Sequence, residues 1–185
     1  MNDAAMKRPG LTAILITAPE LVDYTDRWRS VSRTSMRPDV PLNELIPPHI
    51  TVLVPWIAEP TAADIERLRV ALDEVPAFDI SFMAAGQFPN GTVWLRPEPF
   101  EALQAVSQLV IDAFPECPPY NGDYPEPHPH LTISSSAQGG PAVLADAQAA
   151  LAAEDPPQIT FLGLELWRED SNGVWSQFDW VGVGS

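Results

Sequence analysis

The stretch Pro47-Pro48-His49-Ile50-Thr51-Val52-Leu53-Val54-Pro55-Trp56 has an apolar strand pattern with two polar side chains near its start. Successive side chains of a β-strand alternate between its two faces, so His49 and Thr51 share one face while Ile50 and Val52 share the other. An imidazole and a hydroxyl therefore point the same way, about 7 Å apart along the strand. A single copy of this pattern is also typical of a strand end whose polar groups are satisfied by neighbouring residues.

The same pattern occurs a second time, at His130-Leu131-Thr132-Ile133. The chain has 3 histidines, and two of them stand in this order of histidine, apolar residue, threonine, apolar residue. If the two halves of the chain are related by a pseudo-two-fold axis, the two strands can lie side by side, with both histidines and both threonines facing a common cleft. The repetition therefore favours a functional site over two independent strand ends.

The elements around the two motifs follow the same order in both halves of the chain. In the first half, residue periodicity predicts strands at 11–19, at the first motif and at 77–88, with helices at 20–32 and at 62–75, the second capped by Thr61. The turn signal at 89–92 precedes strands at 93–99 and 129–134, helices at 99–114 and 141–154, and a hairpin of strands at 158–170 and 173–184. We expect one domain, residues 1–185, with lobe-forming halves at approximately 11–88 and 92–183.

Composition and charge restrict the class of protein and its partners. With 45% hydrophobic and 19% charged residues, the chain of 185 residues is typical of a soluble globular domain. The net charge of −15, from 25 acidic and 10 basic residues, disfavours long nucleic acids and anionic membranes as partners. Cys117 is the single cysteine, which excludes an internal disulfide and a cysteine-based zinc site. No signal peptide or membrane-spanning segment is evident, so we expect a cytoplasmic monomer.

Two histidines and two threonines on neighbouring strands suit the opening of a phosphodiester. In-line attack at phosphorus needs a base on the nucleophile and an acid on the leaving oxygen, and the imidazole pKa suits both tasks near neutral pH. The phosphoryl oxygens gain negative charge in the transition state, and threonine hydroxyls can donate hydrogen bonds to them. This arrangement requires no metal ion and no other cofactor.

The paired motifs "HITV" and "HLTI", the two similar halves and the segment "WLRPEPFEAL" between them resemble the 2H phosphoesterases. This family is named for two His-x-Thr/Ser-x motifs, and the chain is most similar to its 2′-5′ RNA ligase-like, cyclic phosphodiesterase branch. The resemblance implies a bilobal α+β fold of two ferredoxin-like halves, whose antiparallel sheets are related by a pseudo-two-fold axis around a central cleft.

The resemblance also implies an activity and its residues. The activity is metal-independent hydrolysis of a 2′,3′-cyclic phosphate or a related small cyclic phosphate, as a nucleotide or at an RNA end. The catalytic residues carried over by position are His49, Thr51, His130 and Thr132, with His49 as the acid and His130 as the base. Some relatives carry a basic residue shortly after the second motif, where this chain has serines at 134–136, so its phosphate affinity or substrate can differ.

Five further residues are candidates for substrate binding. Trp56, Tyr120 and Tyr124 flank the motifs and could stack on a nucleobase, although aromatic residues near strand ends more often pack at the rim of a core. Arg37 and Arg96 could contact phosphate, although an arginine in so acidic a chain commonly pairs with a local carboxylate.

Three alternative functions are compatible with the sequence. The first is RNA-end processing or 2′-5′ RNA ligation, in which an RNA hydroxyl replaces water. The second is a non-catalytic module that binds a nucleotide. The third is a metal-dependent hydrolase in which His128 joins His49 and His130 as ligands, although the prolines at 127 and 129 favour a loop position for His128.

Overall fold

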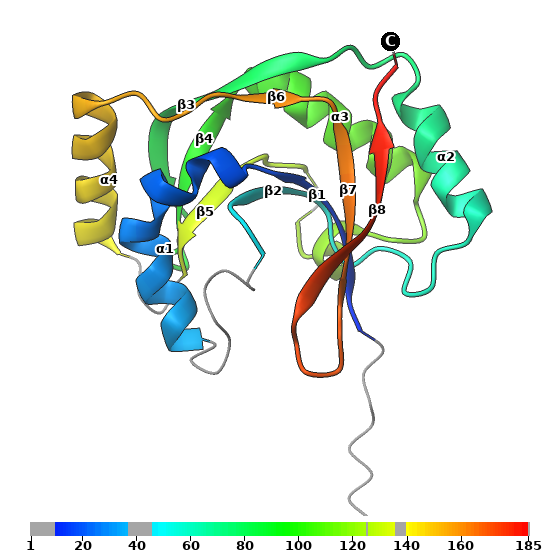
Figure 1. The fold of residues 1–185 in the computed structure, drawn as a ribbon, viewed down its shortest axis with the longest axis horizontal. Helices are drawn as coiled ribbons and strands as arrows, with labels where there is room; N and C mark the ends of the chain where they lie inside the picture. The colour runs from blue at the N-terminus through cyan, green and yellow to red at the C-terminus, as the bar shows by residue number, and fades with distance from the viewer. Residues whose placement is uncertain (1–9, 37–45, 125, 136–139, 185) are drawn as a thin grey trace, which may run out of the picture.

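The strands and helices follow the order that residue periodicity predicts. The structure, a computed structural model, describes residues 10–36, 46–124, 126–135 and 140–184 (Figure 1). In these ranges the strands are β1 (Thr12–Thr17), β2 (His49–Leu53), β3 (Phe78–Gln87), β4 (Val93–Glu98), β5 (Leu131–Ser134), β6 (Ile159–Phe161), β7 (Gly163–Glu169) and β8 (Trp175–Gly182). The helices are α1 (Val22–Met36), α2 (Ala62–Leu72), α3 (Phe100–Ala113) and α4 (Pro141–Ala153), with the short 3₁₀ helices η1 (Pro19–Leu21) and η3 (Pro119–Gly122).

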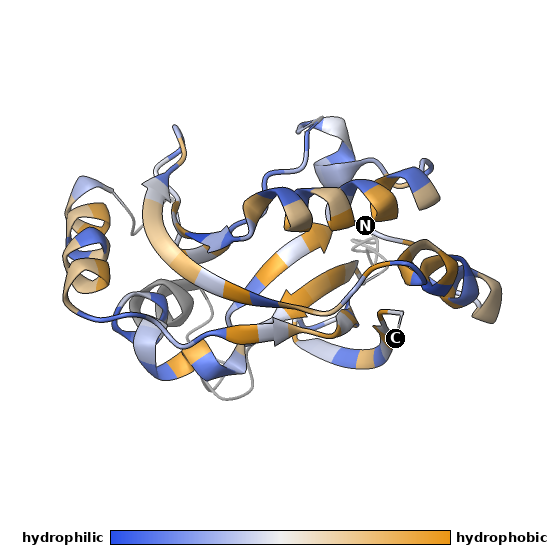
Figure 2. Cartoon of the chain, turned by 90° about the horizontal axis from the view of Figure 1, so that it is seen from above, coloured by the Kyte–Doolittle hydropathy of each residue, from blue (hydrophilic) through white to orange (hydrophobic). Residues whose placement is uncertain are grey.

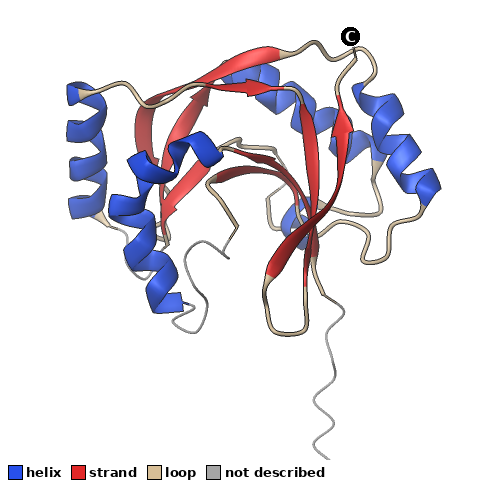
Figure 3. Cartoon of the chain, viewed as in Figure 1, coloured by secondary structure: helices blue, strands red, loops and turns tan. Residues whose placement is uncertain are grey.

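The strands form one curled antiparallel sheet in the order β6-β3-β4-β5-β2-β1-β7-β8 (Figure 3). The two motif strands, β2 and β5, lie next to each other at the centre of this order. Strands of the two sequence halves are exchanged across the sheet, because β3 pairs with β4 and β6 while β7 pairs with β1. The boundary expected between residues 88 and 92 falls in the turn between β3 and β4.

The helices cover one face of the sheet in two pairs. α1 contacts β5 and α4 contacts β3, whereas α2 contacts β8 and α3 contacts β2 and β4 (Figure 3). The indole nitrogen of Trp28 in α1 donates to the Asp146 carboxylate in α4 at 2.6 Å, which ties the first pair together. Figure 2 shows hydrophobic residues along the strands and on the helices, where they build the core between the two layers.

The segment 158–170, which the sequence predicts as one strand, is divided at Leu162. Residues before the division form β6 and pair with β3 near one end of the sheet, whereas residues after it form β7 and pair with β1 near the other. A continuous apolar run does not reveal such a change of partner, because both pieces are strands. No helix in the described ranges has the length and apolarity that a membrane span requires.

Candidate active site

The two motif strands present their polar residues on one face of the sheet, opposite the helices. Ile50 and Leu131 are paired between β2 and β5, and both belong to the helix-covered core. Alternation turns His49, Thr51, His130 and Thr132 to the other face, which we call the motif face. The sequence-based expectation that each motif splits its apolar and polar residues between two faces is confirmed by this burial pattern.

The register of the two strands brings the motifs together. Because Ile50 pairs with Leu131 in an antiparallel sense, the residues on either side are also opposed: Thr51 lies across from His130, and His49 lies across from Thr132. Residues opposed in this way have Cβ atoms about 5 Å apart, and the two histidines, on the diagonal, are separated by roughly 7 to 8 Å. A group of the size of phosphate can be reached from both imidazoles at this spacing.

The imidazoles of the two motifs make equivalent backbone contacts. Nδ1 of His49 lies 2.8 Å from the carbonyl oxygen of Pro47, and Nδ1 of His130 lies 2.7 Å from the carbonyl oxygen of His128. A carbonyl can only accept, so Nδ1 carries the proton and donates in both rings. Nε2 is therefore the nitrogen that each histidine offers for proton transfer. In both motifs a proline stands between the histidine and the accepting carbonyl, a signal that the sequence contains.

Burial gives His130 the character of a base. Desolvation lowers the pKa of His130, the hydrogen bond to the His128 carbonyl opposes this shift, and the nearby His128 imidazole lowers the pKa further. Its ring lies edge-on to Phe88, with centroids 4.9 Å apart, and its centroid is 6.1 Å from that of His128. The neutral form of His130 is thereby favoured at neutral pH.

A cavity of about 470 Å³ lies beside the motif face. Thr51, Thr132 and His130 line it, together with residues of the loops before β5 and before β4. His49 is half-buried on the motif face and is not among the residues that line this cavity. Three of the four motif residues therefore meet at the cavity, and the fourth lies across the strand pair from Thr132.

The two tyrosine candidates lie at the cavity. Tyr120 has a left-handed backbone, with φ of 49°, and its N–H donates to the Val54 carbonyl at 2.7 Å, which ties η3 to the end of β2. Burial raises the pKa of Tyr120, and an interaction with the Thr51 hydroxyl opposes that shift. Tyr124 contacts Tyr120 edge-on with centroids 5.3 Å apart and is 57% exposed. Both rings remain candidates for contact with substrate.

Of the other three candidates, Trp56 and Arg96 are occupied by contacts within the protein. Trp56 is 4% exposed and packs edge-on against Phe114 in the core, so its indole is unsuited to stacking on a ligand. Arg96 pairs with Glu98 at 2.7 Å and lies over the Phe100 ring, which is the local pairing that an acidic chain favours. Arg37 lies outside the described residues.

His128 occupies a loop position, as the flanking prolines indicate. Its ring lies among Phe88, Trp94 and Phe100, with centroids 5.1 to 5.5 Å away. Burial lowers its pKa, and Arg96 lowers it further. In the described part of the chain, no three histidine, cysteine or acidic side chains are arranged to hold a metal ion.

Sequence reasoning did not single out several residues of this face. Trp94 is the cross-strand partner of Thr132, and Thr17 is the partner of His49. The motif face therefore carries a row of residues from four strands: Trp94, Thr132, His49 and Thr17. Alternation along 93–99 places Trp94 and Arg96 on a common face, but no signal in the sequence tells which strand lies beside them.

A family model described as the 2′-5′ RNA ligase superfamily matches residues 18–173, which include both motifs. None of the curated proteins compared with this chain matches it.

Solved structures share the fold at low sequence identity. E. coli LigT complexed with NADP+ has a TM-score of 0.60 at 15% identity, over 96% of this chain and 99% of that one. A structure described as a phosphoesterase has the same score and identity, over 96% of this chain and all of its own, 100%. LigT complexed with 3′-AMP has a TM-score of 0.57 at 16% identity, over 95% and 99% of the two chains. The mixed α and β fold with a curled antiparallel sheet is therefore similar to that of LigT.

Proposed function

The chain belongs to the 2′-5′ RNA ligase superfamily, the 2H phosphoesterases, and from this premise we propose that it hydrolyses a small cyclic phosphate, such as a 2′,3′-cyclic nucleotide. The observation that carries the proposal is the opposed pair of motifs, in which each imidazole has Nδ1 bound to a backbone carbonyl and each histidine faces a threonine. The two LigT complexes support a nucleotide as ligand, because NADP+ and 3′-AMP both carry a phosphate ester on ribose.

The proposed reaction moves one proton at each histidine. His130 Nε2 takes a proton from water as the water oxygen bonds to phosphorus, and the lowered pKa of His130 supports its role as the base. His49 Nε2 gives a proton to the leaving ribose oxygen as its bond to phosphorus breaks. The products are a phosphomonoester and a free hydroxyl, with His130 protonated and His49 neutral, and exchange with solvent restores both.

Thr51 and Thr132 serve the phosphoryl group in this proposal. Each hydroxyl lies across from a motif histidine, so it can donate to a non-bridging oxygen while that histidine moves its proton. Donors that are positioned before the reaction stabilise developing charge without reorganisation during the step.

The pseudo-two-fold relation of two ferredoxin-like halves belongs to the same proposal. Each half contributes one motif strand, β2 or β5, to the centre of the sheet. β3 of the first half lies beside strands of the second half, and β7 of the second half lies beside β1 of the first. This symmetric strand order supports two related halves around a shared site.

Substitution of the two histidines tests the function directly. We expect His49→Ala and His130→Ala each to lower turnover of a 2′,3′-cyclic nucleotide by about 10²-fold to 10⁴-fold, because each removes general acid or base catalysis. The double variant should lose less than the product of the two effects, since either change already disrupts the coupled proton transfers. Near-normal turnover by either folded single variant would contradict the assignment.

Removal of metal ions separates this proposal from the metal-dependent alternative. We expect exhaustive chelation to leave kcat unchanged, because histidine and threonine side chains supply the proton transfers and the oxyanion donors. His128→Ala is the matched variant and should retain most of the activity. Activity that chelation abolishes and zinc or manganese restores would instead favour a site with three histidine ligands.

A further inference from the structure

A carboxylate occupies the motif face on the side of His49. Glu165 in β7 is the cross-strand partner of Leu15, and Leu15 is in turn the partner of Thr51, so all three residues are on the same face. Thr17, two residues along β1 from Leu15, is the partner of His49. The Thr17 hydroxyl donates to Glu165 Oε1 at 2.5 Å, so it connects this carboxylate to the residue that lies beside His49.

The carboxylate is held from two sides. The indole N–H of Trp167 donates to Glu165 Oε2 at 2.9 Å, while Thr17 holds Oε1. Glu165 is half-buried, so its negative charge is screened less than that of a fully exposed side chain. Both oxygens are fixed, and the charge therefore keeps a constant position relative to β1 and β2.

The two imidazoles consequently have different electrostatic surroundings. His130 is close to a second imidazole, that of His128, and beyond it β4 carries the ion pair of Arg96 with Glu98. The loop before β5 contributes Glu126 to the cavity wall. On the other side, β1 contributes the uncharged Thr17 beside His49, and β7 contributes Glu165, which stands in the row of Leu15 and Thr51 and reaches Thr17 by a hydrogen bond.

We propose that Glu165 is a positioning residue that holds His49 in its protonated form and thereby decides the roles of the two histidines, so that His130 takes the proton of water and His49 gives its proton to the leaving oxygen. The inference rests on the proposed function for its catalytic meaning. A fixed negative charge near an imidazole favours the imidazolium, whereas a second imidazole near His130 disfavours it. The structure is close to symmetric in its motifs, and Glu165 breaks that symmetry.

Titration of the histidine rings by NMR tests the proposal without substrate. We expect Glu165→Gln, which keeps the size and one acceptor oxygen, to lower the pKa of His49 by about half a unit to one unit, the order expected when a charge is removed at a partly solvated site. The pKa of His130 should change by less than about a fifth as much as that of His49, because distance and screening weaken the effect. Thr17→Val should shift His49 in the same direction by a smaller amount, since Trp167 still holds the carboxylate.

The matched control removes the same charge from the same strand. Glu169 is four residues further along β7, about 13 Å away, so Glu169→Gln should leave the titration of His49 unchanged. The pH profile of kcat gives the second readout, in which Glu165→Gln moves the alkaline limb to lower pH and leaves the acid limb in place.

Two results would overturn the role of Glu165. One is an unchanged His49 titration in folded Glu165→Gln, and the other is a shift of equal size in Glu169→Gln. Failure of the proposed function would be a separate result. In that case the wild-type protein would show normal histidine titrations but would hydrolyse none of the cyclic phosphates offered.

Discussion

At the scale of single residues, the environment of His130 determines how the reaction depends on pH. Desolvation lowers the pKa of His130 below the ordinary imidazole value of 6.5, and the His128 imidazole adds to the effect. A base acts in its neutral form, so the acid limb of kcat/KM should rise with pH with a midpoint below 6.5, while the alkaline limb reports loss of the proton from His49. A profile of kcat/KM between about pH 4.5 and pH 8 measures this midpoint, because that range extends to both sides of an ordinary imidazole pKa.

His128→Gln is the control for this pH dependence. It removes the neighbouring imidazole and keeps the backbone carbonyl that binds His130, so the midpoint should move up toward 6.5. A midpoint above 6.5 in the wild-type protein would show that the neutral form of His130 is not the catalytic base.

The same shift makes stability depend on pH in a definite direction. The folded protein binds a proton at His130 more weakly than the unfolded chain, so the unfolded chain binds more protons over this range. The contribution of His130 to stability is therefore complete above pH 6.5 and is lost as the pH falls from there toward the lower folded pKa.

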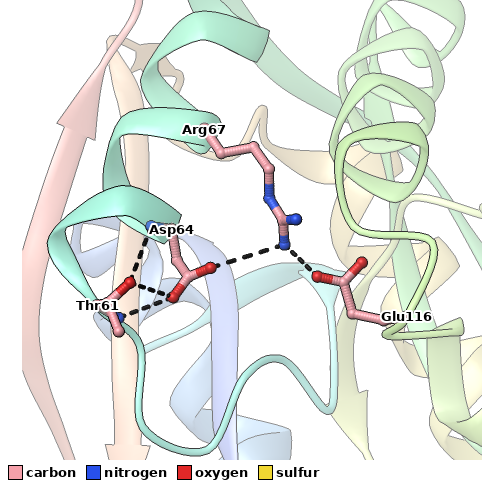
Figure 4. A network of polar contacts seen from close by, with 4 residues as sticks. All are labelled: Thr61, Asp64, Arg67 and Glu116. Atoms are coloured by element: carbon pink, nitrogen blue, oxygen red, sulfur yellow. Dashed lines mark hydrogen bonds and ion pairs between the residues drawn. The ribbon is translucent and has the colours of Figure 1, made fainter.

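At the scale of elements, a capping box starts α2 beyond the end of β2. The Thr61 hydroxyl oxygen accepts from the Asp64 N–H at 3.4 Å, while the Asp64 carboxylate accepts from the Thr61 N–H at 2.9 Å (Figure 4). Arg67 continues this network to Glu116, after α3, and its guanidinium lies 4.1 Å from the centroid of the Phe114 ring. The network therefore joins α2 to the segment that leads to η3 and Tyr120.

Loss of the cap should reduce stability without changing the chemistry. We expect Thr61→Ala to lower the free energy of unfolding by about 1 kcal/mol, the usual value of an N-cap side chain. Urea unfolding monitored by tryptophan fluorescence measures the change. Thr61→Ser retains the hydroxyl and should be close to wild type.

Catalysis distinguishes a local role of the cap from a wider one. Thr61 lies at the start of α2 and does not line the cavity, so kcat on a cyclic phosphate should be the same in Thr61→Ala as in the wild-type protein at a temperature where both are folded. A kcat reduced tenfold or more would show that the network positions η3 for catalysis.

At the scale of the whole molecule, the net charge of −15 should govern substrate length. Each phosphate outside the site meets a repulsive field, so kcat/KM should not increase from a cyclic mononucleotide to a long RNA that ends in a cyclic phosphate. Added salt screens repulsion, so the rate on the long substrate should be flat or rise slightly between about 50 and 200 mM salt. Measurement of kcat/KM for both substrates across this range checks the prediction.

Strong preference for the long substrate would have a different physical meaning. If that preference decreased steeply with salt, several phosphates would be neutralised by basic residues despite the net charge. The alternative of RNA-end processing would then replace hydrolysis of a small cyclic phosphate. Arg37 and Arg96 are the first residues to substitute in that case.

The sequence by itself determined the elements and the four motif residues of the candidate site. Alternation within His49-Ile50-Thr51-Val52 is a local property of a strand, so the polar face could be predicted without knowledge of any neighbour. The repeated order of elements likewise depends on local periodicity, and this is why the bounds of most helices and strands agree with expectation.

Only the tertiary structure decided which strands lie side by side. The opposition of His49 to Thr132, the burial of Trp56 against Phe114 and the position of Glu165 beside Thr17 all join residues that are distant in the chain. Apolar periodicity does not encode such pairings, since a strand presents the same pattern to any partner that covers its apolar face. The residues that can carry proton transfer are therefore evident in the sequence, whereas the charge that distinguishes one imidazole from the other arises from the folding of β7 against β1.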